Sequence, residues 1–414
     1  YILANFKVES ADDTRVVFSH TLDNGLKITR SYEISPKGDE REPYLIGHKT
    51  SFKNDGEQVF PADILWLNLG LMPPTDSDST GDLQSVGYFD GENDEFTSGK
   101  VFTDSKGFIF GIGAHEAKPY VLSNAPIKWG AVRNQFFAAI VTVKGQARAQ
   151  ALFARGQVLD NEAIPGAVLA PAPQDNAQQI VIGETAHNVA PAGDLKKGVT
   201  GALAFPYTEL APGKTSELEV SYYVGPKEYV RLDRLGDSQD KVMGFGFFTG
   251  FISKAMLLFL VGVHSVLDSL FASTWSWGWA IIIVTLIIKT LMWPLTAVQT
   301  RSAKNMSKIS APMKELREKY KDNPQRMQQE MMKLYKEHKV NPLAGCLPLF
   351  IQLPIFIGLF FMLRSASELR YQPFLWITDL SMPDTVGHIA GFPVHVLALL
   401  MGVTMFLQMR LSPT

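Results

Sequence analysis

The distribution of apolar residues divides this chain into a polar first part and an apolar second part. Up to about Gly236 the sequence has no long apolar run and is rich in Gly, Pro, Asp and Thr. From Phe245 onward it carries several apolar stretches that are long enough to cross a bilayer. This contrast predicts at least two domains, of which the second is embedded in a membrane.

The first part has the pattern of antiparallel β structure. Residues 217–224 alternate between polar and apolar types with period two, as in a half-buried strand. The turn sequence Asn24-Gly25 lies between two short β-branched runs, which is typical of a hairpin. Further short runs recur, separated by turn residues and with no helical pattern between them. We therefore predict an all-β sandwich over residues 1–236.

The second part has the pattern of apolar helices. Residues 247–271 are apolar but contain Lys254 and Asp268, which are about four helical turns apart and share a face. This favours an amphipathic helix in the membrane interface, within a linker over residues 237–274. An α-helical transmembrane bundle is predicted over residues 275–414. Its spans cover about 277–298, 343–363 and 389–409.

The loops between the predicted spans differ in charge. Eleven Lys and Arg residues lie between the first two spans, whereas Arg364 and Arg370 alone lie between the second and third. The positive-inside rule then places residues 300–341 in the cytoplasm and residues 364–388 outside, with the β domain also outside.

Residues 300–341 are predicted to form a cytoplasmic helical hairpin, because apolar residues recur at helical spacing on both sides of Asn323-Pro324. Its basic surface would dock an acidic or RNA-rich partner. The alternative is a solvated loop that only sets the topology. The candidate docking residues are Arg317, Lys319, Lys321, Arg326, Lys333 and Lys336.

Composition excludes several classes of function. The net charge of −2 gives no support for specific DNA binding. Cys346 is the one cysteine and lies in an apolar run, so no intrachain disulfide forms and a packing role is expected. The first part shows no metal-ligand spacing, nucleophile elbow or phosphate loop. We therefore predict neither a cofactor nor an enzyme.

Lys289 is the most informative residue of the apolar part. It lies near the middle of the first predicted span, where a charge costs at least about 2.5–3.5 kcal/mol. Thr285, Met292 and Thr296 follow at the spacing of one helix face. The three predicted spans contain no Asp or Glu that could pair with Lys289. The side chain of Lys289 therefore either extends to the membrane interface, or faces water where it can bind a negatively charged group of a substrate.

The other two spans also carry polar residues. Gln352 lies midway through the second span, and Thr404 and Gln408 lie one turn apart in the third. Each alone could make an ordinary interhelical hydrogen bond. Together with the face of Lys289 they predict a polar, water-accessible cavity within the bilayer.

These segments resemble the YidC family of bacterial membrane protein insertases. The matching sequences are WGWAIII at 277–283, MWPLT at 292–296, QEMMKLYK at 329–336, NPLAGCLPLFIQLPIF at 341–356, and MGVTMF at 401–406 with SPT at 412–414. Upstream, GPKEY at 225–229 resembles the exit from the family's periplasmic β domain. The resemblance is dense from about residue 270 and thin before residue 225.

The resemblance implies a protein that inserts and folds hydrophobic segments of nascent proteins in the bacterial inner membrane, without nucleotide or cofactor. It implies a multi-pass topology with the β domain in the periplasm. The implied partners are nascent membrane proteins, the lipid bilayer, the ribosome and the Sec translocon. Because the family core has five spans, we expect this chain to lack the last two spans and a leading anchor.

The resemblance also assigns a substrate groove. The family usually carries Arg at the position of Lys289, and Thr285 lines the same groove. Gln352, Pro354 and Phe356 lie on the span along which substrates slide. Lys keeps the charge of Arg but loses its planar fork of donors.

Two other functions compete with this interpretation. A secondary transporter or channel would also place Lys289 in a substrate pathway, but it predicts inverted repeats, and the sequence shows no internal repeat. A membrane-anchored carbohydrate-binding domain could stack sugars on Trp66 or Trp129, although these residues could equally pack in a core.

Overall fold

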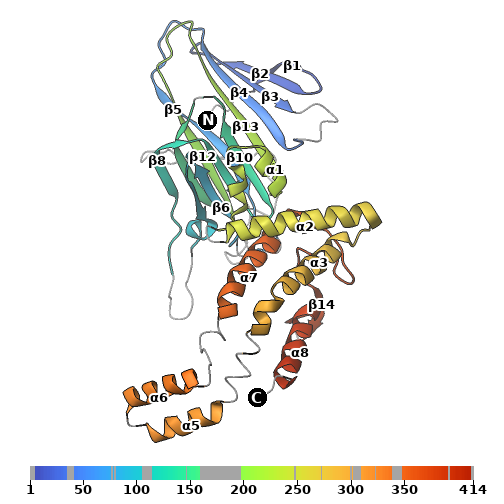
Figure 1. Cartoon of the computed structure of the whole chain (residues 1–414). Helices are drawn as coiled ribbons and strands as arrows, with labels where there is room; N and C mark the ends of the chain where they lie inside the picture. The colour runs from blue at the N-terminus through green and yellow to red at the C-terminus, as the bar shows by residue number, and fades with distance from the viewer. Residues whose placement is uncertain are drawn as a thin grey trace. The chain divides into compact units, whose positions relative to one another are not determined.

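The chain forms two compact units, Tyr1–Met243 and Gly244–Thr414, which we call the β unit and the helical unit. Figure 1 shows the computed structural model of the whole chain. The structure describes residues 5–34, 42–75, 78, 81–104, 114–145, 147–158, 197–246, 249–271, 273–298, 301, 309–321, 323–337, 347–389 and 392–411.

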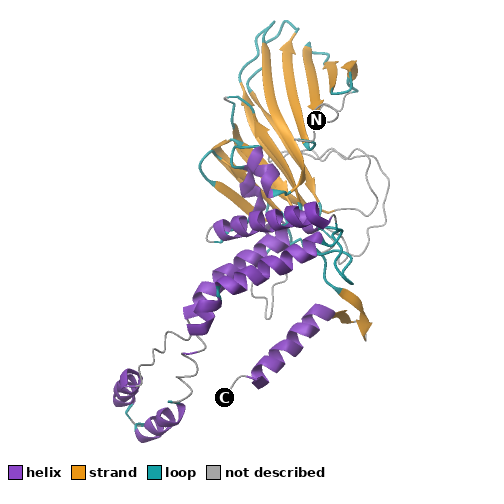
Figure 2. Ribbon diagram, turned by 45° about the vertical axis from the view of Figure 1, so that its right-hand side comes forward, coloured by secondary structure: helices purple, strands orange, loops and turns teal. Residues whose placement is uncertain are grey.

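The β unit contains two antiparallel sheets (Figure 2). The larger sheet has the strand order β1-β2-β3-β4-β13-β10-β9-β6-β7, and the smaller has the order β5-β12-β11-β8. The strands of the larger sheet are β1 Lys7–Ala11, β2 Arg15–Thr21, β3 Leu26–Ile34, β4 Leu45–Asn54, β6 Ser85–Phe89, β7 Asp94–Ser98, β9 Trp129–Arg133, β10 Phe137–Val143 and β13 Thr215–Pro226. Those of the smaller sheet are β5 Asp63–Met72, β8 Tyr120–Ile127, β11 Ala149–Val158 and β12 Lys197–Tyr207, and a short helix η1 covers Gly99–Phe102.

One apolar core joins the two sheets. Val86 and Val132 from the larger sheet cluster with Leu69, Leu152 and Leu203 from the smaller sheet, and all five are buried. The two sheets therefore pack face to face and exclude water from between them, which is the main favourable term in their folding. The antiparallel sandwich predicted from the sequence is confirmed for this unit.

The predicted hairpin turn is also confirmed. Gly25 adopts a φ of 84°, in the left-handed region that favours glycine, and β2 pairs with β3 on either side of the turn. The Gly25 N–H donates to the carbonyl of Leu22 at 2.9 Å.

The chain leaves the β unit through α1 (Tyr229–Arg234) and η3 (Gln239–Met243). Asp237 and Ser238 both adopt positive φ, 51° and 56°, between these helices. The Trp129 Nε1–H donates to the Asp237 carbonyl at 2.8 Å, and Lys128 Nζ lies 2.5 Å from Asp237 Oδ1. Two neighbouring residues at the start of β9 therefore hold this unusual backbone in place.

Arg133, at the end of β9, holds the last part of the exit. Its guanidinium donates to the Val242 carbonyl at 2.6 Å and to Ser85 Oγ at 2.6 Å, and it lies 3.7 Å from the centroid of the Phe96 ring. Burial lowers the pKa of Arg133 to about 10, so the group is charged at neutral pH. We call Lys128, Trp129 and Arg133 the exit clamp.

His48 in β4 makes the stability of the β unit depend on pH. It is 4% exposed and lies 4.5 Å from the ring of Tyr32, centroid to centroid. Burial, and secondarily Arg30, lower the pKa of His48 from 6.5 to about 4. Between these values the unfolded chain binds a proton that the folded chain excludes. The contribution of neutral His48 to the free energy of unfolding is therefore fully present above pH 6.5. It is lost as the pH falls from 6.5 toward 4.

We expect the free energy of unfolding to fall by about 1.4 kcal/mol per pH unit in this window because of His48 alone. His48→Gln, which keeps a polar partner for Thr50 Oγ1, should remove that part of the slope. Pulse proteolysis in increasing urea at pH 7, 6 and 5 measures it. An unchanged slope in the variant would assign the pH dependence to other groups.

The helical unit is built from apolar helices and a small β hairpin. Its elements are α2 Gly250–Phe271, α3 Ser276–Leu291, α5 Ser310–Lys319, α6 Pro324–Glu337, α7 Leu347–Ser365, η5 Ser367–Leu369, β14 Thr385–Ile389, β15 Phe392–His395 and α8 Val396–Leu411. α5 and α6 occupy the two halves of the predicted hairpin, joined at Asn323. The Tyr335 hydroxyl of α6 lies 3.4 Å from Met313 Sδ of α5.

α2 packs against both α3 and α7. Its buried residues, Ser253, Met256, Leu257 and Leu260, follow the spacing of one helix face. Ser253 Oγ donates to the Gly358 carbonyl of α7 at 3.0 Å. Small residues at this contact let the two backbones approach closely, as in membrane helix pairs.

The third predicted span begins too early. Residues 385–389 and 392–395 form the paired strands β14 and β15, in which His388 pairs with Pro393, and α8 begins at Val396. Pro393 has no N–H for a helical hydrogen bond and restricts the residue before it, so the strand is favoured there. The helix expected over 389–409 is therefore wrong at residues 389 and 392–395, which are strand, and residues 390–391 lie outside the described residues.

The first two predicted spans also differ in their bounds. α3 ends at Leu291, and residues 293–298 are helical again after a turn at Met292. Pro294 explains the interruption, because it removes one helical hydrogen bond and its ring clashes with the preceding turn. α7 is described from Leu347, and residues 343–346 lie outside the described residues.

Among the described helices, α2 alone is long and apolar enough to cross a membrane, with 22 residues and a mean hydropathy of 1.8. α3, α8 and Gln352–Ser365 of α7 are apolar but shorter. The interfacial placement of α2 and the spanning role of the other three helices stay predictions.

Candidate functional site

Lys289 lies in the last turn of α3, closer to the helix end than the predicted span implied. Its side chain is exposed. Within the described residues no carboxylate forms an ion pair with its ammonium group. The C-terminal turn of a helix carries partial negative charge, which favours a cation at this position.

Thr285 lies on α3 with Lys289, whereas Thr296 lies in the helical residues 293–298 that follow the turn at Met292. The Thr285 hydroxyl donates to the Ile281 carbonyl at 2.7 Å, and the Thr296 hydroxyl donates to the Met292 carbonyl at 3.0 Å. Such bonds to the preceding helical turn satisfy a hydroxyl without a partner helix. Met292 is half-buried, while Thr285 and Thr296 are exposed.

The candidate residues of the other two helices are mostly exposed. Gln352 and Phe356 project from α7, and Pro354 beside them is half-buried. Thr404 and Gln408 project from α8, where the Thr404 hydroxyl donates to the Met401 carbonyl at 2.8 Å.

The described contacts bring together only part of the predicted cavity. Thr285, Lys289, Met292 and Thr296 share one side of α3 and of its continuation. α3 and α7 both contact α2, whereas α8 is exposed from Leu397 to Leu411. The convergence of all three helices on one cavity therefore stays a prediction.

The basic residues of the α5–α6 hairpin lie on its surface. All six candidate docking residues are exposed, and Lys333 is the one of them that forms a described ion pair, with Glu330 at 2.6 Å. Leu316 of α5 and Leu334 of α6 are apolar and half-buried. The hairpin thus presents a basic outer surface, as its sequence predicts.

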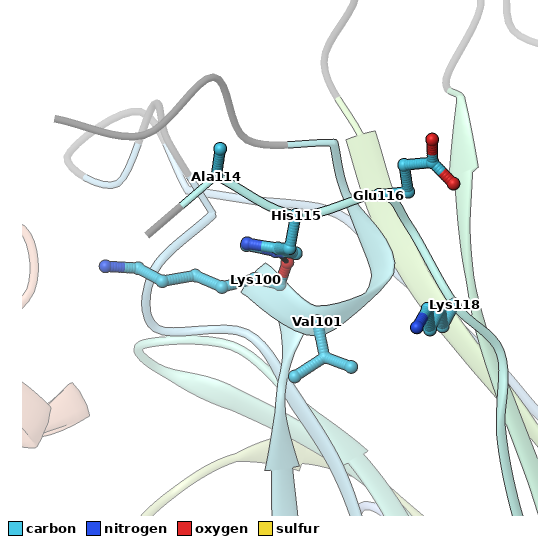
Figure 3. Close-up of a pocket in the computed structure, with 6 residues that line it drawn as sticks. All are labelled: Lys100, Val101, Ala114, His115, Glu116 and Lys118. Atoms are coloured by element: carbon cyan, nitrogen blue, oxygen red, sulfur yellow. Dashed lines mark hydrogen bonds between the residues drawn. The ribbon is translucent and has the colours of Figure 1, made fainter. Parts of the chain in front are cut away.

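Figure 3 shows an open depression of the β unit, with a volume of about 570 Å³. Lys100 and His115 lie close together in it, and Glu116 points away from them. His115 Nε2 is 2.9 Å from the Lys100 carbonyl, and Lys100 Nζ is 3.0 Å from Asp82 Oδ2. Lys100 and His115 therefore each interact with a neighbouring group. In the part of the chain that the structure describes, no cluster of His, Cys, Asp or Glu could hold a metal ion.

The two tryptophans considered for sugar stacking differ in position. Trp129 is fully buried and stacks on Phe89 at 5.5 Å between ring centroids. Trp129 therefore packs in the core and donates the hydrogen bond of the exit clamp. Trp66 on β5 is half-buried and lies in the same register as Ala204 of β12.

Two family models together match almost the whole chain. The family described as "60Kd inner membrane protein" matches residues 268–414, and the family described as "YidC periplasmic domain" matches residues 4–259. The matches meet near the boundary between the β unit and the helical unit. They define the class as inner membrane proteins that carry a periplasmic domain. The chain belongs to the YidC family.

Individual relatives support the same assignment, and each is named "Membrane protein insertase YidC". The protein of Syntrophobacter fumaroxidans is 41% identical over 213 residues, which is 50% of this chain and 37% of the relative. That of Janthinobacterium sp. is 37% identical over 219 residues, 52% of this chain and 37% of the relative. That of Citrifermentans bemidjiense is 42% identical over 213 residues, 51% of this chain and 37% of the relative. These matches span little more than a third of each relative's length.

Sequence reasoning missed two arrangements. The exit clamp joins residues about 110 positions apart, and no local pattern in the sequence indicates such a contact. Phe374 packs on the start of α3, where a Cβ atom at Gly278 would lie 2.1 Å from its ring. The glycine between Trp277 and Trp279 was the available signal for such a close approach.

Proposed function

We propose that this protein inserts hydrophobic segments of nascent proteins into the bacterial inner membrane through a hydrated groove that carries the charge of Lys289. The observation that carries this proposal is a cation on an apolar helix, exposed and without a carboxylate partner among the described residues. Family membership and the names of the relatives give the proposal its substrate class.

The groove lowers the cost of moving a polar tail across the bilayer. A polar group transferred into hydrocarbon without hydrogen bonds costs about 2–7 kcal/mol. Water around Lys289 and the neighbouring threonines shortens the apolar part of the path. No covalent step and no cofactor is needed for this action.

Charge attraction acts on the polar tail of the substrate, and the hydrophobic effect acts on its apolar segment. Lys289 attracts acidic residues in the tail that is to be moved, because opposite charges interact strongly where water is scarce. The apolar segment of the substrate then leaves sideways along α7, past Phe356, into the lipid. Residues that we assign to the groove are Thr285, Lys289, Met292, Thr296, Gln352, Pro354, Phe356, Thr404 and Gln408.

The α5–α6 hairpin is proposed to face the cytoplasm and to dock the ribosome or the Sec translocon. Its exposed cations suit an acidic or RNA-rich surface. Under this topology α3, α7 and α8 cross the inner membrane and the β unit lies in the periplasm.

Vesicles containing the purified full-length protein test the proposed function. A short single-span protein with an acidic tail is added without nucleotide, and its tail is probed with protease. We expect the tail to become protected in vesicles with the protein and to stay accessible in empty vesicles. Equal protection in both, or a requirement for nucleotide, would contradict the proposal.

A further inference from the structure

The turn between α7 and the β14–β15 hairpin, residues 366–380, is fixed on the start of α3. The N–H groups of Phe374 and Ile377 donate to each other's carbonyls at 2.8 and 2.9 Å. The Phe374 ring is 9% exposed and meets Trp275 and Trp279 at ring-centroid distances of 6.1 and 5.7 Å. Gly278 provides the space for this ring. These hydrogen bonds and ring contacts hold the turn against α3, and we call it the aromatic turn.

The aromatic turn directs three large apolar side chains outward. Tyr371, Leu375 and Trp376 are 71%, 53% and 44% exposed. Tyr371 and Leu375 adopt φ of 59° and 54°, a conformation that costs such residues about 1–3 kcal/mol each. In water this arrangement combines backbone strain with exposed apolar surface. A favourable environment for the three side chains would offset both costs.

An apolar crevice of about 370 Å³ lies beside the aromatic turn. Leu267 and Phe271 of α2 line it together with Trp279 and Ile283 of α3. Trp279 also contacts Phe374, so the crevice and the aromatic turn are continuous. The crevice is lined mainly by hydrocarbon, with Ser273 and Ser276 as its polar residues.

We propose that the aromatic turn and this crevice form a phospholipid site at the membrane interface, with an acyl chain in the crevice. Trp and Tyr combine an apolar body with a polar tip, which suits the headgroup level. Arg370 lies beside Tyr371, with its guanidinium 4.8 Å from the ring centroid and a hydrogen bond of 2.9 Å to the hydroxyl. Its guanidinium therefore lies beside the exposed apolar surface of the turn, and a guanidinium is a group that binds phosphate oxygens.

The inference depends on the proposed membrane location, but it adds a site that insertion itself does not require. Full-length protein with Cys346→Ala receives one new cysteine at a time, W376C, I283C or the reference E57C in the β unit, and each is spin-labelled. The protein is placed in vesicles of phosphatidylethanolamine and phosphatidylglycerol. Collision rates with oxygen and with a water-soluble nickel complex are then measured.

We expect the labels at 376 and 283 to collide with oxygen and to be shielded several-fold from nickel relative to the label at Glu57. Nickel access at 376 equal to that at Glu57 would overturn the proposal, because the turn would lie in water. Shielding of both labels from oxygen as well would also overturn it, because another protein segment would then cover the site.

A double variant, Tyr371→Asn with Leu375→Asn, provides a second measurement. Asn tolerates positive φ, so the turn keeps its backbone while it loses apolar surface. We expect the label at 376 to become more accessible to nickel, and no change would contradict the proposal. Insertion by each labelled protein is assayed in parallel. Labels in water with normal insertion refute only the lipid site, whereas labels in lipid without insertion refute only the proposed function.

Discussion

Replacing Trp129 by Ala is expected to lower the free energy of unfolding of the β unit by about 3–5 kcal/mol. The indole is fully buried, and its removal leaves a large cavity against Phe89. The variant also loses the hydrogen bond to the Asp237 carbonyl, which leaves a strained backbone without its main support. Pulse proteolysis of the purified protein in increasing urea measures the loss, because the protease cleaves the unfolded fraction.

Two control variants separate the cavity from the clamp. Trp129→Phe keeps most of the ring volume but lacks the N–H donor, so we expect a smaller loss, of which about 0.5–1.5 kcal/mol comes from the hydrogen bond. Val121→Ala changes an exposed residue of β8 and should shift stability by about 0.5 kcal/mol or less. If the Trp129→Ala protein were as stable as the Val121→Ala protein, the exit clamp would not contribute to the free energy of unfolding.

Replacing Lys289 by Ala is expected to reduce insertion of an acidic-tailed substrate by about tenfold or more. A charge pair in a partly screened site contributes on the order of 1–4 kcal/mol, and each 1.4 kcal/mol is a factor of ten in rate. Lys289→Arg keeps the cation and should retain most of the activity. The rate of tail protection in vesicles measures the effect.

Thr290→Val is the matched control for that series. Thr290 follows Lys289 on α3, and its hydroxyl donates to the Leu286 carbonyl of its own helix at 2.8 Å. Val has nearly the same size and shape as Thr, so the change removes only the hydroxyl of the residue next to the cation. Insertion by this variant should stay close to that of the unchanged protein, and a loss equal to that of Lys289→Ala would point to a structural disturbance of α3.

The β unit was predictable because its signals are local. Period-two alternation over residues 217–224 and the Asn24-Gly25 turn each determine a strand or a hairpin within a few residues. The pairing of β5 with β12, by contrast, joins residues that are between 127 (Met72 and Val199) and 144 (Asp63 and Tyr207) positions apart along the chain. No local pattern specifies such a partner, so the strand order follows only from the structure.

In the apolar part of the chain, the positions of the helices were predictable but their ends were not. Hydropathy located each helix but not its ends, since Pro294 and Pro393 act on backbone hydrogen bonds that a composition window averages out. Lys289 was predicted in mid-span and lies in the last turn of α3 for this reason. The docking of Phe374 on Gly278 involves two segments separated by a whole helical hairpin, and only the glycine hinted at it.

A charge-reversal measurement tests the central claim most directly. Cells depleted of their own insertase carry the full-length protein with Lys289 unchanged or with Lys289→Glu, and insertion of a substrate with an acidic or a lysine-bearing tail is scored by protease protection. We predict that Lys289→Glu fails with the acidic tail and regains insertion with the lysine-bearing tail. Equal insertion of both tails by both proteins would contradict a direct action of the Lys289 charge on the substrate.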